Sequence, residues 1–271
     1  MKKIVFLLLT LSVLSGRAQN FEGVITWKIS MEITDPQMKA QMAETQKKMN
    51  DPATQTQMKE MEERMNDPEF KAMMESNPQL KAQMEVAMKM MKGGEANSMM
   101  PSKMVVKLKN ENAVMLMDGM MKVETLYLKG KNSSYKINRE AKTYSALPAH
   151  TDDPNNKVDI KVTKTGETAK VLEYPCSKYT VDVTSKGNTI TYFVWTTTAL
   201  KDIDLKSLAR SRMGNQETNF YEKLDGVPLK TEMTTPQGKM TMEVAEIKKQ
   251  SLPSSEFEIP SGFKEVPYSV Y

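Results

Sequence analysis

The sequence is poor in the residues on which most catalytic and metal sites depend. It has a single histidine, His150, and a single cysteine, Cys176. It contains no G-x-S-x-G elbow, no H-E-x-x-H helix and no phosphate-binding loop. One cysteine cannot form an internal disulfide, so stability has to come from a hydrophobic core, in which we expect Cys176 to be buried. These absences predict a non-enzymatic protein with no catalytic residues, no cofactor and no site for a hard metal ion.

A long apolar run is also missing. The run from Ile4 to Leu14 follows Lys2 and Lys3 and precedes Gly16-Arg17-Ala18. It is too short to span a bilayer and is typical of a secretory signal peptide, which we expect to occupy residues 1–18. No cysteine is present at the cleavage site to accept a lipid. The sequence therefore predicts a periplasmic or secreted protein without a transmembrane segment.

The chain also lacks a large excess of charge of either sign. The precursor has a formal net charge of +4, and removal of the three basic residues of the signal peptide leaves the chain near neutrality. No run of five like charges occurs. A binding partner recognised by a strong positive field, such as nucleic acid or an anionic membrane, is therefore excluded.

Alternation of apolar and polar residues is present at both ends of the chain. In FEGVITWKISMEI, residues 21–33, the apolar side chains recur at every second position, which predicts a half-buried strand. The pattern returns after Pro101 in a series of short runs bounded by Gly, Asn, Asp and Pro, including NFYEKL at 219–224. Such runs favour an antiparallel sheet built from hairpins, formed by residues 19–34 and 101–271. Residues 199–213, with Leu200, Ile203, Leu208 and Met213, predict a helix that lies across the open face of this sheet.

Residues 35–100 differ in kind. They hold 14 of the 25 methionines, no tryptophan or tyrosine, and almost no β-branched residues, which is a helical composition. An imperfect repeat starts with Asp-Pro or Asn-Pro at residues 35, 51, 67 and 77. Asp or Asn can cap a helix and Pro fits its first turn, so the repeat predicts short helices in series rather than one long helix. We interpret the segment as a methionine-rich helical insertion in the β domain.

Apolar side chains recur at helical spacing within each repeat and give each helix one apolar stripe. Methionine is flexible and polarizable, and proteins use it on surfaces that accept many apolar shapes. The predicted hydrophobic-ligand site includes these stripes, with two tryptophans from the sheet as aromatic walls. Its residues are Met58, Met61, Met65, Phe70, Met73, Met74, Leu80, Met84, Met88, Met91, Trp27 and Trp195.

Three alternatives remain open for the methionines. The stripes can pack on one another as a plain helical cap over the sheet, in which case the protein is a structural or interaction module. Their thioethers can bind Cu(I), a soft ion, at the clusters Met88, Met90 and Met91, Met99 and Met100, and Met115, Met117, Met120 and Met121. They can also consume oxidant through reversible sulfoxide formation.

The β segments resemble a known family. FEGVITWKISMEI, TGETAKVLEYPCSKYTVDV, TYFVWTT and SSEFEIPSGFKEV are similar to an uncharacterised secreted domain family of Bacteroidota, over residues 21–33 and 103–266. The resemblance implies a fold like that of the LolA/LolB lipoprotein carriers, a curved antiparallel half-barrel with helices closing a hydrophobic concavity. It implies no catalytic residues.

The insertion resembles a second group. NDPEFKAMMESNPQLKAQM is similar to the Asp-Pro and Asn-Pro helical repeats of Hsp70/Hsp90 co-chaperones and ubiquilins, which bind apolar client segments. Carried onto this chain, the groove positions are Pro68, Phe70, Met73, Met74, Pro78, Leu80 and Met84. Together the patterns predict an exported α+β protein that binds or carries a hydrophobic ligand at the cell envelope, where an envelope protein is its potential partner.

Overall fold

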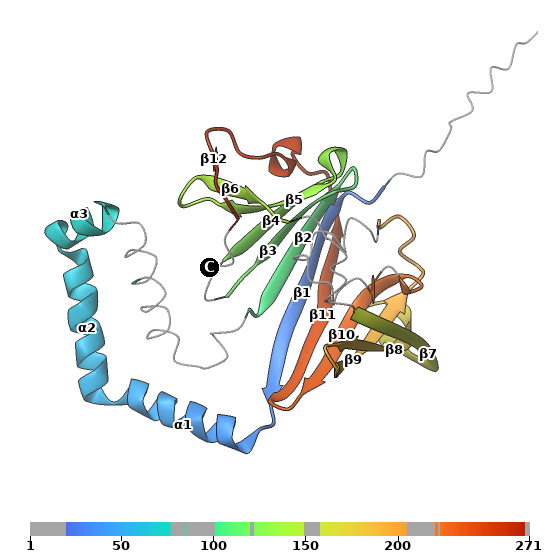
Figure 1. Cartoon of the computed structure of the whole chain (residues 1–271), viewed down its shortest axis with the longest axis horizontal. Coiled ribbons are helices and arrows are strands. Elements are labelled where there is room, and N and C mark those ends of the chain that lie inside the picture. The colour runs from blue at the N-terminus through green and yellow to red at the C-terminus, as the bar shows by residue number, and fades with distance from the viewer. Residues whose placement is uncertain are drawn as a thin grey trace, which may run out of the picture.

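In a computed structural model, the described residues form a twelve-stranded sheet, and three helices follow its first strand (Figure 1). The structure describes residues 20–76, 84, 101–119, 122–148, 158–204, 220–221 and 223–268. The expected signal peptide, residues 1–18, lies outside these described residues. Among the described residues, no helix is both long and apolar enough to cross a membrane.

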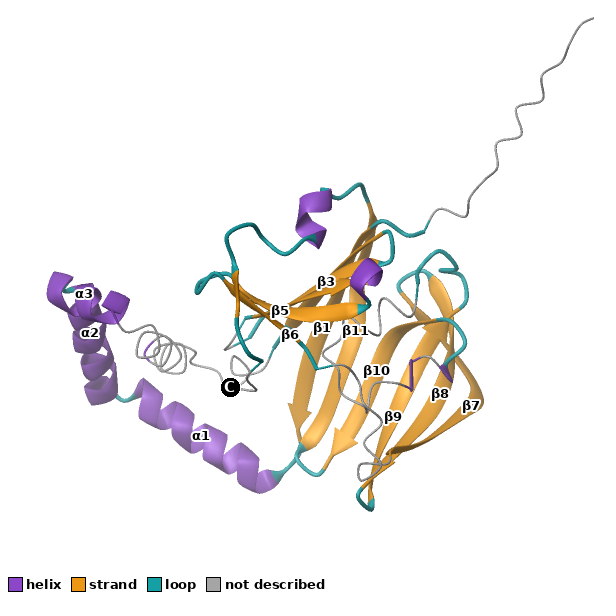
Figure 2. Cartoon of the chain, turned by 45° about the horizontal axis from the view of Figure 1, so that its top comes forward, coloured by secondary structure: helices purple, strands orange, loops and turns teal. Residues whose placement is uncertain are grey.

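The sheet is antiparallel except at one edge. Its strand order is β12-β6-β5-β4-β3-β2-β1-β11-β10-β9-β8-β7, and β12 pairs with β6 in parallel. Because β12 and β7 end the order without pairing to each other, the sheet is curved but not closed, as Figures 1 and 2 show. This arrangement is consistent with the expected half-barrel. The strands are β1 (Gly23–Ile33), β2 (Lys103–Lys109), β3 (Asn112–Met117), β4 (Val123–Leu128), β5 (Ser133–Asn138), β6 (Thr143–Ala146), β7 (Val158–Val171), β8 (Tyr174–Ser185), β9 (Asn188–Thr197), β10 (Val227–Thr235), β11 (Gly238–Lys249) and β12 (Lys264–Glu265).

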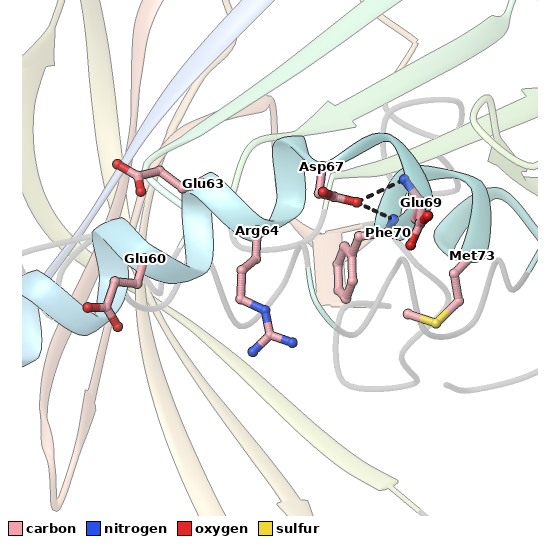
Figure 3. Close-up of a pocket in the computed structure, with 7 residues that line it drawn as sticks. All are labelled: Glu60, Glu63, Arg64, Asp67, Glu69, Phe70 and Met73. Atoms are coloured by element: carbon pink, nitrogen blue, oxygen red, sulfur yellow. Dashed lines mark hydrogen bonds between the residues drawn. The ribbon is translucent and has the colours of Figure 1, made fainter.

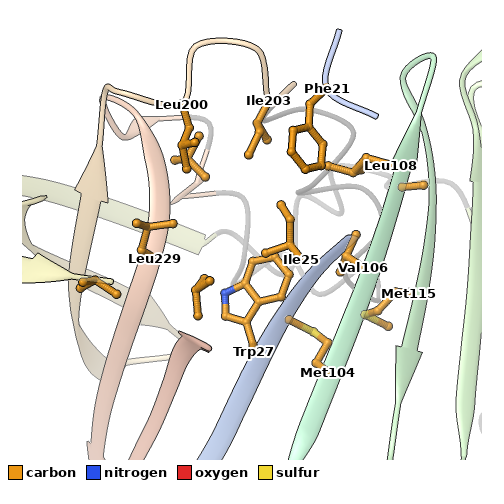
Figure 4. Packing of buried hydrophobic residues seen from close by; sticks show 14 of the residues in the cluster. Phe21, Ile25, Trp27, Met104, Val106, Leu108, Met115, Leu200, Ile203 and Leu229 are labelled. Carbon is orange, nitrogen blue, oxygen red and sulfur yellow. The ribbon is translucent and has the colours of Figure 1, made fainter. Parts of the chain in front are cut away.

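Strand β1 lies at the centre of the sheet and confirms the predicted alternation. Ile25, Trp27 and Ile29 are buried, whereas Lys28 and Ser30 between and beyond them are exposed. On one side β1 pairs with β2, and on the other it pairs with β11, from Gly23 opposite Lys249 to Ile33 opposite Gly238. The main hydrophobic core forms around this strand, with Trp27 at its middle (Figure 4).

The C-terminal segment covers a second apolar cluster on β3 to β5. Leu252 and Phe257, the latter in a 3-10 turn (Ser254–Phe257), pack with Leu126 and Ile137. The Leu252 amide donates to Glu22 Oε1 at 2.6 Å, and Lys109 Nζ lies 2.9 Å from the same oxygen. These two interactions, the backbone hydrogen bond first, lower the pKa of Glu22. The carboxylate therefore ties the start of the chain to its end.

Two predicted elements differ in the structure. Residues 199–204 form turns instead of the start of a helix, because Leu200 and Ile203 insert into the main core while the Phe21 amide donates to Asp202 O at 2.8 Å. The rest of the predicted helix, 205–213, lies outside the described residues. In the predicted strand 219–224, Phe220 and Tyr221 belong to a tight turn, in which the Leu224 amide donates to Tyr221 O at 3.4 Å. The two rings pack on β8 and β9, and this buries them without a strand.

Cys176 lies in β8 and is buried, as predicted, with 2% of its surface exposed. Its thiol contacts Tyr174 O at 3.5 Å. Burial raises the pKa of the Cys176 thiol above its ordinary value, because the thiolate is poorly solvated there. The side chain therefore remains a protonated, unreactive part of the core at neutral pH.

We expect iodoacetamide at pH 8 to alkylate Cys176 at least about a thousandfold more slowly in the native chain than in urea, since only a small unfolded fraction exposes it. The rates can be measured by mass spectrometry.

The buried thiol also makes the stability of the protein depend on pH. Because the pKa of Cys176 is raised in the folded state, the stabilisation from the protonated thiol is present below the pKa of the unfolded state. It is lost as pH rises through the pKa of the folded state. The free energy of unfolding should therefore fall relative to Cys176→Ala above about pH 8.5. Equal rates in the native and unfolded chains would contradict the buried position.

Candidate functional site

The methionine arm, defined as residues 36–76, consists of three helices joined end to end. They are α1 (Pro36–Asn50), α2 (Pro52–Asn66) and α3 (Pro68–Ser76). Figures 1 and 2 show the arm leaving the end of β1 and standing away from the sheet. The prediction of short helices in series is confirmed for these three; the fourth repeat, from Asn77, lies outside the described residues except for Met84, which is half-buried in a helical turn.

Aspartate caps separate the helices. The Asp35 carboxylate accepts from the Met38 amide at 2.6 Å, and Asp51 accepts from the Thr54 amide at 3.3 Å. Asp67 accepts from the amides of Glu69 and Phe70 at 2.9 and 3.2 Å. Each cap is followed by a proline at the first helical position, where its missing N–H costs no hydrogen bond. The repeat therefore sets both where each helix begins and where the chain changes direction.

The apolar stripe of the arm remains partly open to solvent. Helix α2 has no buried residue: Met58 and Met65 are half-buried, and Met61 is 37% exposed. On α3, Met73 is 45% exposed whereas Met74 is only 6% exposed. Large apolar side chains in such positions lose hydrophobic free energy unless another surface covers them.

A hollow of about 910 Å³ lies at the junction of α2 and α3 (Figure 3). Phe70 and Met73 supply its apolar part, and both belong to the predicted site. Charged residues complete the lining, namely Glu60, Glu63, Arg64, Asp67 and Glu69. The hollow therefore offers apolar contact beside a mainly acidic rim, a combination that suits an amphipathic molecule with an apolar segment and a cationic or hydrogen-bond-donating group.

The polar face of the arm is ordinary solvated surface. Lys48 and Glu44 form an ion pair of 2.8 Å one helical turn apart on α1, with both side chains well exposed. The hydrogen bond between them lowers the pKa of Glu44 and raises that of Lys48. Exposed pairs of this kind add little stability. Their role is to give α1 a charged face that is hydrated.

The two tryptophans lie away from the arm. Trp27 is 2% exposed and fills the middle of the main core, so it packs the sheet and lines no surface (Figure 4). Trp195 is half-buried on β9, with Lys178 Nζ 5.5 Å and Lys230 Nζ 5.1 Å from its ring centroid. Neither ring contributes to the hollow. Of the remaining predicted residues, Leu80, Met88 and Met91 lie outside the described part of the chain.

A second group of methionines, which the sequence analysis did not single out, lies on the sheet. The methionine row, defined as Met31, Met240 and Met233, consists of direct cross-strand partners on β1, β11 and β10, and Tyr192 on β9 comes next to Met233. All four side chains are half-buried. The signal was present in the alternation of KMTMEV, residues 239–244, but the partners are set by a register that the sequence does not reveal.

Sites for hard metal ions are missing from the described ranges. No three His, Cys, Asp or Glu side chains there are grouped so that they could hold a metal ion. Carboxylates on the sheet pair with lysines instead: Glu232 lies 3.1 Å from Lys230 and 2.9 Å from Lys239. The chemistry that this part of the molecule offers is apolar contact and soft thioether sulfur.

The sheet gives the structural class of the protein, and a comparison with family models gives its family. The curved, unclosed antiparallel sheet, with few helices among the described residues, gives an α+β protein whose sheet is consistent with a half-barrel. Residues 73–263 match a family model described as "Domain of unknown function (DUF4412)". Since this stretch is most of the chain, the protein belongs to that family, which agrees with the expectation of an uncharacterised domain family. The match begins within α3, so it includes neither β1 nor most of the arm.

Other comparisons add little. No curated protein matches the sequence. A solved structure described as "Structure of PNGF-II in C2 space group" is similar to part of it, with 19% identity and a TM-score of 0.28. The similar region covers 59% of this chain and 28% of that one. Such a slight likeness carries no argument about fold or function.

Proposed function

We propose that the protein is a non-enzymatic binder or carrier of hydrophobic ligand, and that the methionine arm is its binding surface. The ligand class is an acyl chain, a lipid or an apolar peptide segment. The observation that carries the proposal is the partly exposed stripe of Met58, Met61, Phe70 and Met73 on helices that stand away from the sheet. Burial of this stripe against a ligand is the mechanism, since apolar surface gains roughly 25 cal/mol per Å² on leaving water.

The sheet supports this proposal by its shape. An unclosed, curved sheet agrees with the LolA/LolB-like carrier fold that we propose for the family. In this scheme residues 1–18 are a signal peptide and the mature chain works in the periplasm or outside the cell, where a soluble carrier of apolar cargo is needed. The resemblance to a secreted domain family of Bacteroidota, which we propose extends to this chain, is compatible with this location. Residues 35–100, which include α1, α2 and α3, act as the methionine-rich insertion that holds the ligand.

The test is a comparison of two sets of substitutions in the arm. We expect Met58→Gln, Met61→Gln and Met73→Gln together to weaken binding of 1-N-phenylnaphthylamine by at least about tenfold, which corresponds to about 1.4 kcal/mol. Removing three apolar contacts is more than sufficient for that loss. Glutamine and methionine have similar helix propensity, so the helices of the arm should remain and the far-UV circular dichroism of the protein should not change. Fluorescence titration measures the affinity.

The matched control is Met58→Leu, Met61→Leu and Met73→Leu. Leucine keeps the apolar surface, so this variant should bind the dye within about twofold of the wild type, since volume-conserving apolar exchanges are well tolerated. Native mass spectrometry of the protein purified from its own cells, followed by organic extraction, then identifies any bound lipid. Equal dye affinity in the glutamine variant and the wild type would sink the proposal.

A further inference from the structure

We propose that the methionine row of Met31, Met240 and Met233 binds one Cu(I) ion through its three thioether sulfurs. The site lies on the sheet, separate from the arm, and its ligands differ from the clusters that the sequence suggested. The inference does not depend on the hydrophobic-ligand function, because it rests on the strand register, burial and chemistry of residues on the sheet. Ag(I), which has the same charge and the same preference for sulfur, should bind in the same place.

The register brings the three side chains to one face. Met31 is the direct partner of Met240, and Met240 is the direct partner of Met233. Directly opposed residues in antiparallel strands point to the same face, with Cβ atoms about 4.5 to 5.5 Å apart. The outer two strands are therefore separated by about two strand spacings, roughly 9.6 Å. A methionine sulfur lies two bonds beyond Cβ on a flexible stem, so the outer sulfurs can lean towards the one on Met240.

The environment selects for a soft, singly charged ion. All three methionines are half-buried, so an ion has access but is partly shielded from water. Charged neighbours along the strands, Glu32 and Lys239, alternate with the row and so point to the other face. Neutral thioethers bind soft ions such as Cu(I) and are poor ligands for Mg²⁺, Ca²⁺ or Mn²⁺. A site made of three thioethers therefore selects Cu(I) over these hard divalent ions.

Met240 packs against the main core, which accounts for part of its burial. β-branched residues are preferred in strands, and Ile29 and Ile33 flank Met31 on the same face of β1. Methionine also fills gaps in cores, but three methionines in direct register place three soft sulfur atoms on adjacent strands, which packing alone does not require. Thioethers also have no pKa in the physiological range, so the site would bind without releasing protons.

The experiment uses the full chain and Cu(I) supplied anaerobically as its bicinchoninate complex. We expect the wild type to remove one Cu(I) per chain from the chromophore, and native mass spectrometry with Ag(I) to show the same stoichiometry. X-ray absorption should show sulfur alone as the ligand atom. The variant Met31→Leu, Met233→Leu, Met240→Leu should lose affinity by at least about tenfold, because loss even of an outer-shell partner often costs that much.

Leucine replaces each thioether by a similar apolar volume, so this variant tests sulfur rather than packing. Met104→Leu is the matched control, since Met104 is a fully buried methionine of the same sheet on β2, and it should leave copper binding unchanged. Dye binding by the arm should also be unchanged in the triple leucine variant, which separates this inference from the proposed function. No bound ion in the wild type, or the same affinity in the triple variant, would overturn the proposal.

Discussion

Replacement of Trp27 with alanine is expected to lower the free energy of unfolding by about 3 to 5 kcal/mol, the range for truncating a large buried aromatic side chain. Trp27 is among the largest fully buried side chains of the molecule. It lies on the central strand opposite Val244 on one side and Met104 on the other. The cavity left by the missing indole ring would therefore border β1, β2 and β11. Urea unfolding followed by far-UV circular dichroism gives the free energy.

Trp27→Phe is the control, and we expect it to cost clearly less than the alanine variant, since most of the apolar volume remains. If Trp27 serves packing alone, the folded fraction of both variants should bind the hydrophobic dye as the wild type does. A selective loss of dye binding in a stable Trp27→Phe protein would instead return this residue to the ligand site.

Replacement of Gly238 with alanine is the second change with a large expected effect. Gly238 is buried at the start of β11, and a Cβ atom there would lie 2.1 Å from Glu32 O and 2.9 Å from Ile33 Cα. Both contacts are backbone atoms of β1, so the strands have to move apart. We expect a loss of at least about 2 kcal/mol, within the range for overpacking a tight site.

Gly130→Ala provides the comparison, because a Cβ atom at Gly130 would meet nothing within 4 Å. It should change the free energy of unfolding by no more than about 0.5 kcal/mol. The Gly238 variant should also loosen the base of the arm, since the amides of Thr34 and Asp35 both donate to Gln237 O. Hydrogen exchange at these two amides measures that effect. Unchanged stability of Gly238→Ala would contradict the close approach of β1 and β11.

Local patterns in the sequence were sufficient for the elements that depend on neighbours in the chain. The period of two in β1 fixes which side chains are buried, and the aspartate-proline repeats fix the helix starts at Pro36, Pro52 and Pro68. Caps and alternation act over a few residues, so they can be read without knowing the fold. The antiparallel sheet and its hairpins follow from the same information.

The elements that were missed depend on distant contacts. Leu200 and Ile203 have helical spacing but form turns, because both side chains pack into the main core and the Asp202 carbonyl accepts a hydrogen bond from the Phe21 amide. The run NFYEKL at 219–224 resembles a strand, but Phe220 and Tyr221 lie in a turn that packs on β8 and β9. The methionine row was invisible for a similar reason: Met31 and Met240 meet only through a pairing of strands from opposite ends of the chain.

The pairing of β1 with β11 also has a consequence for how the chain folds. Gly23, near the beginning, pairs with Lys249, near the end, and this ladder lies in the middle of the sheet. During synthesis β1 therefore has no partner on one side until residues 238–249 have been made. Sheets that depend on such distant pairs fold slowly, because loop closure has to precede the contacts that reward it. The nascent chain is thus expected to keep one edge of its central strand open, and in need of protection, until β11 has been made.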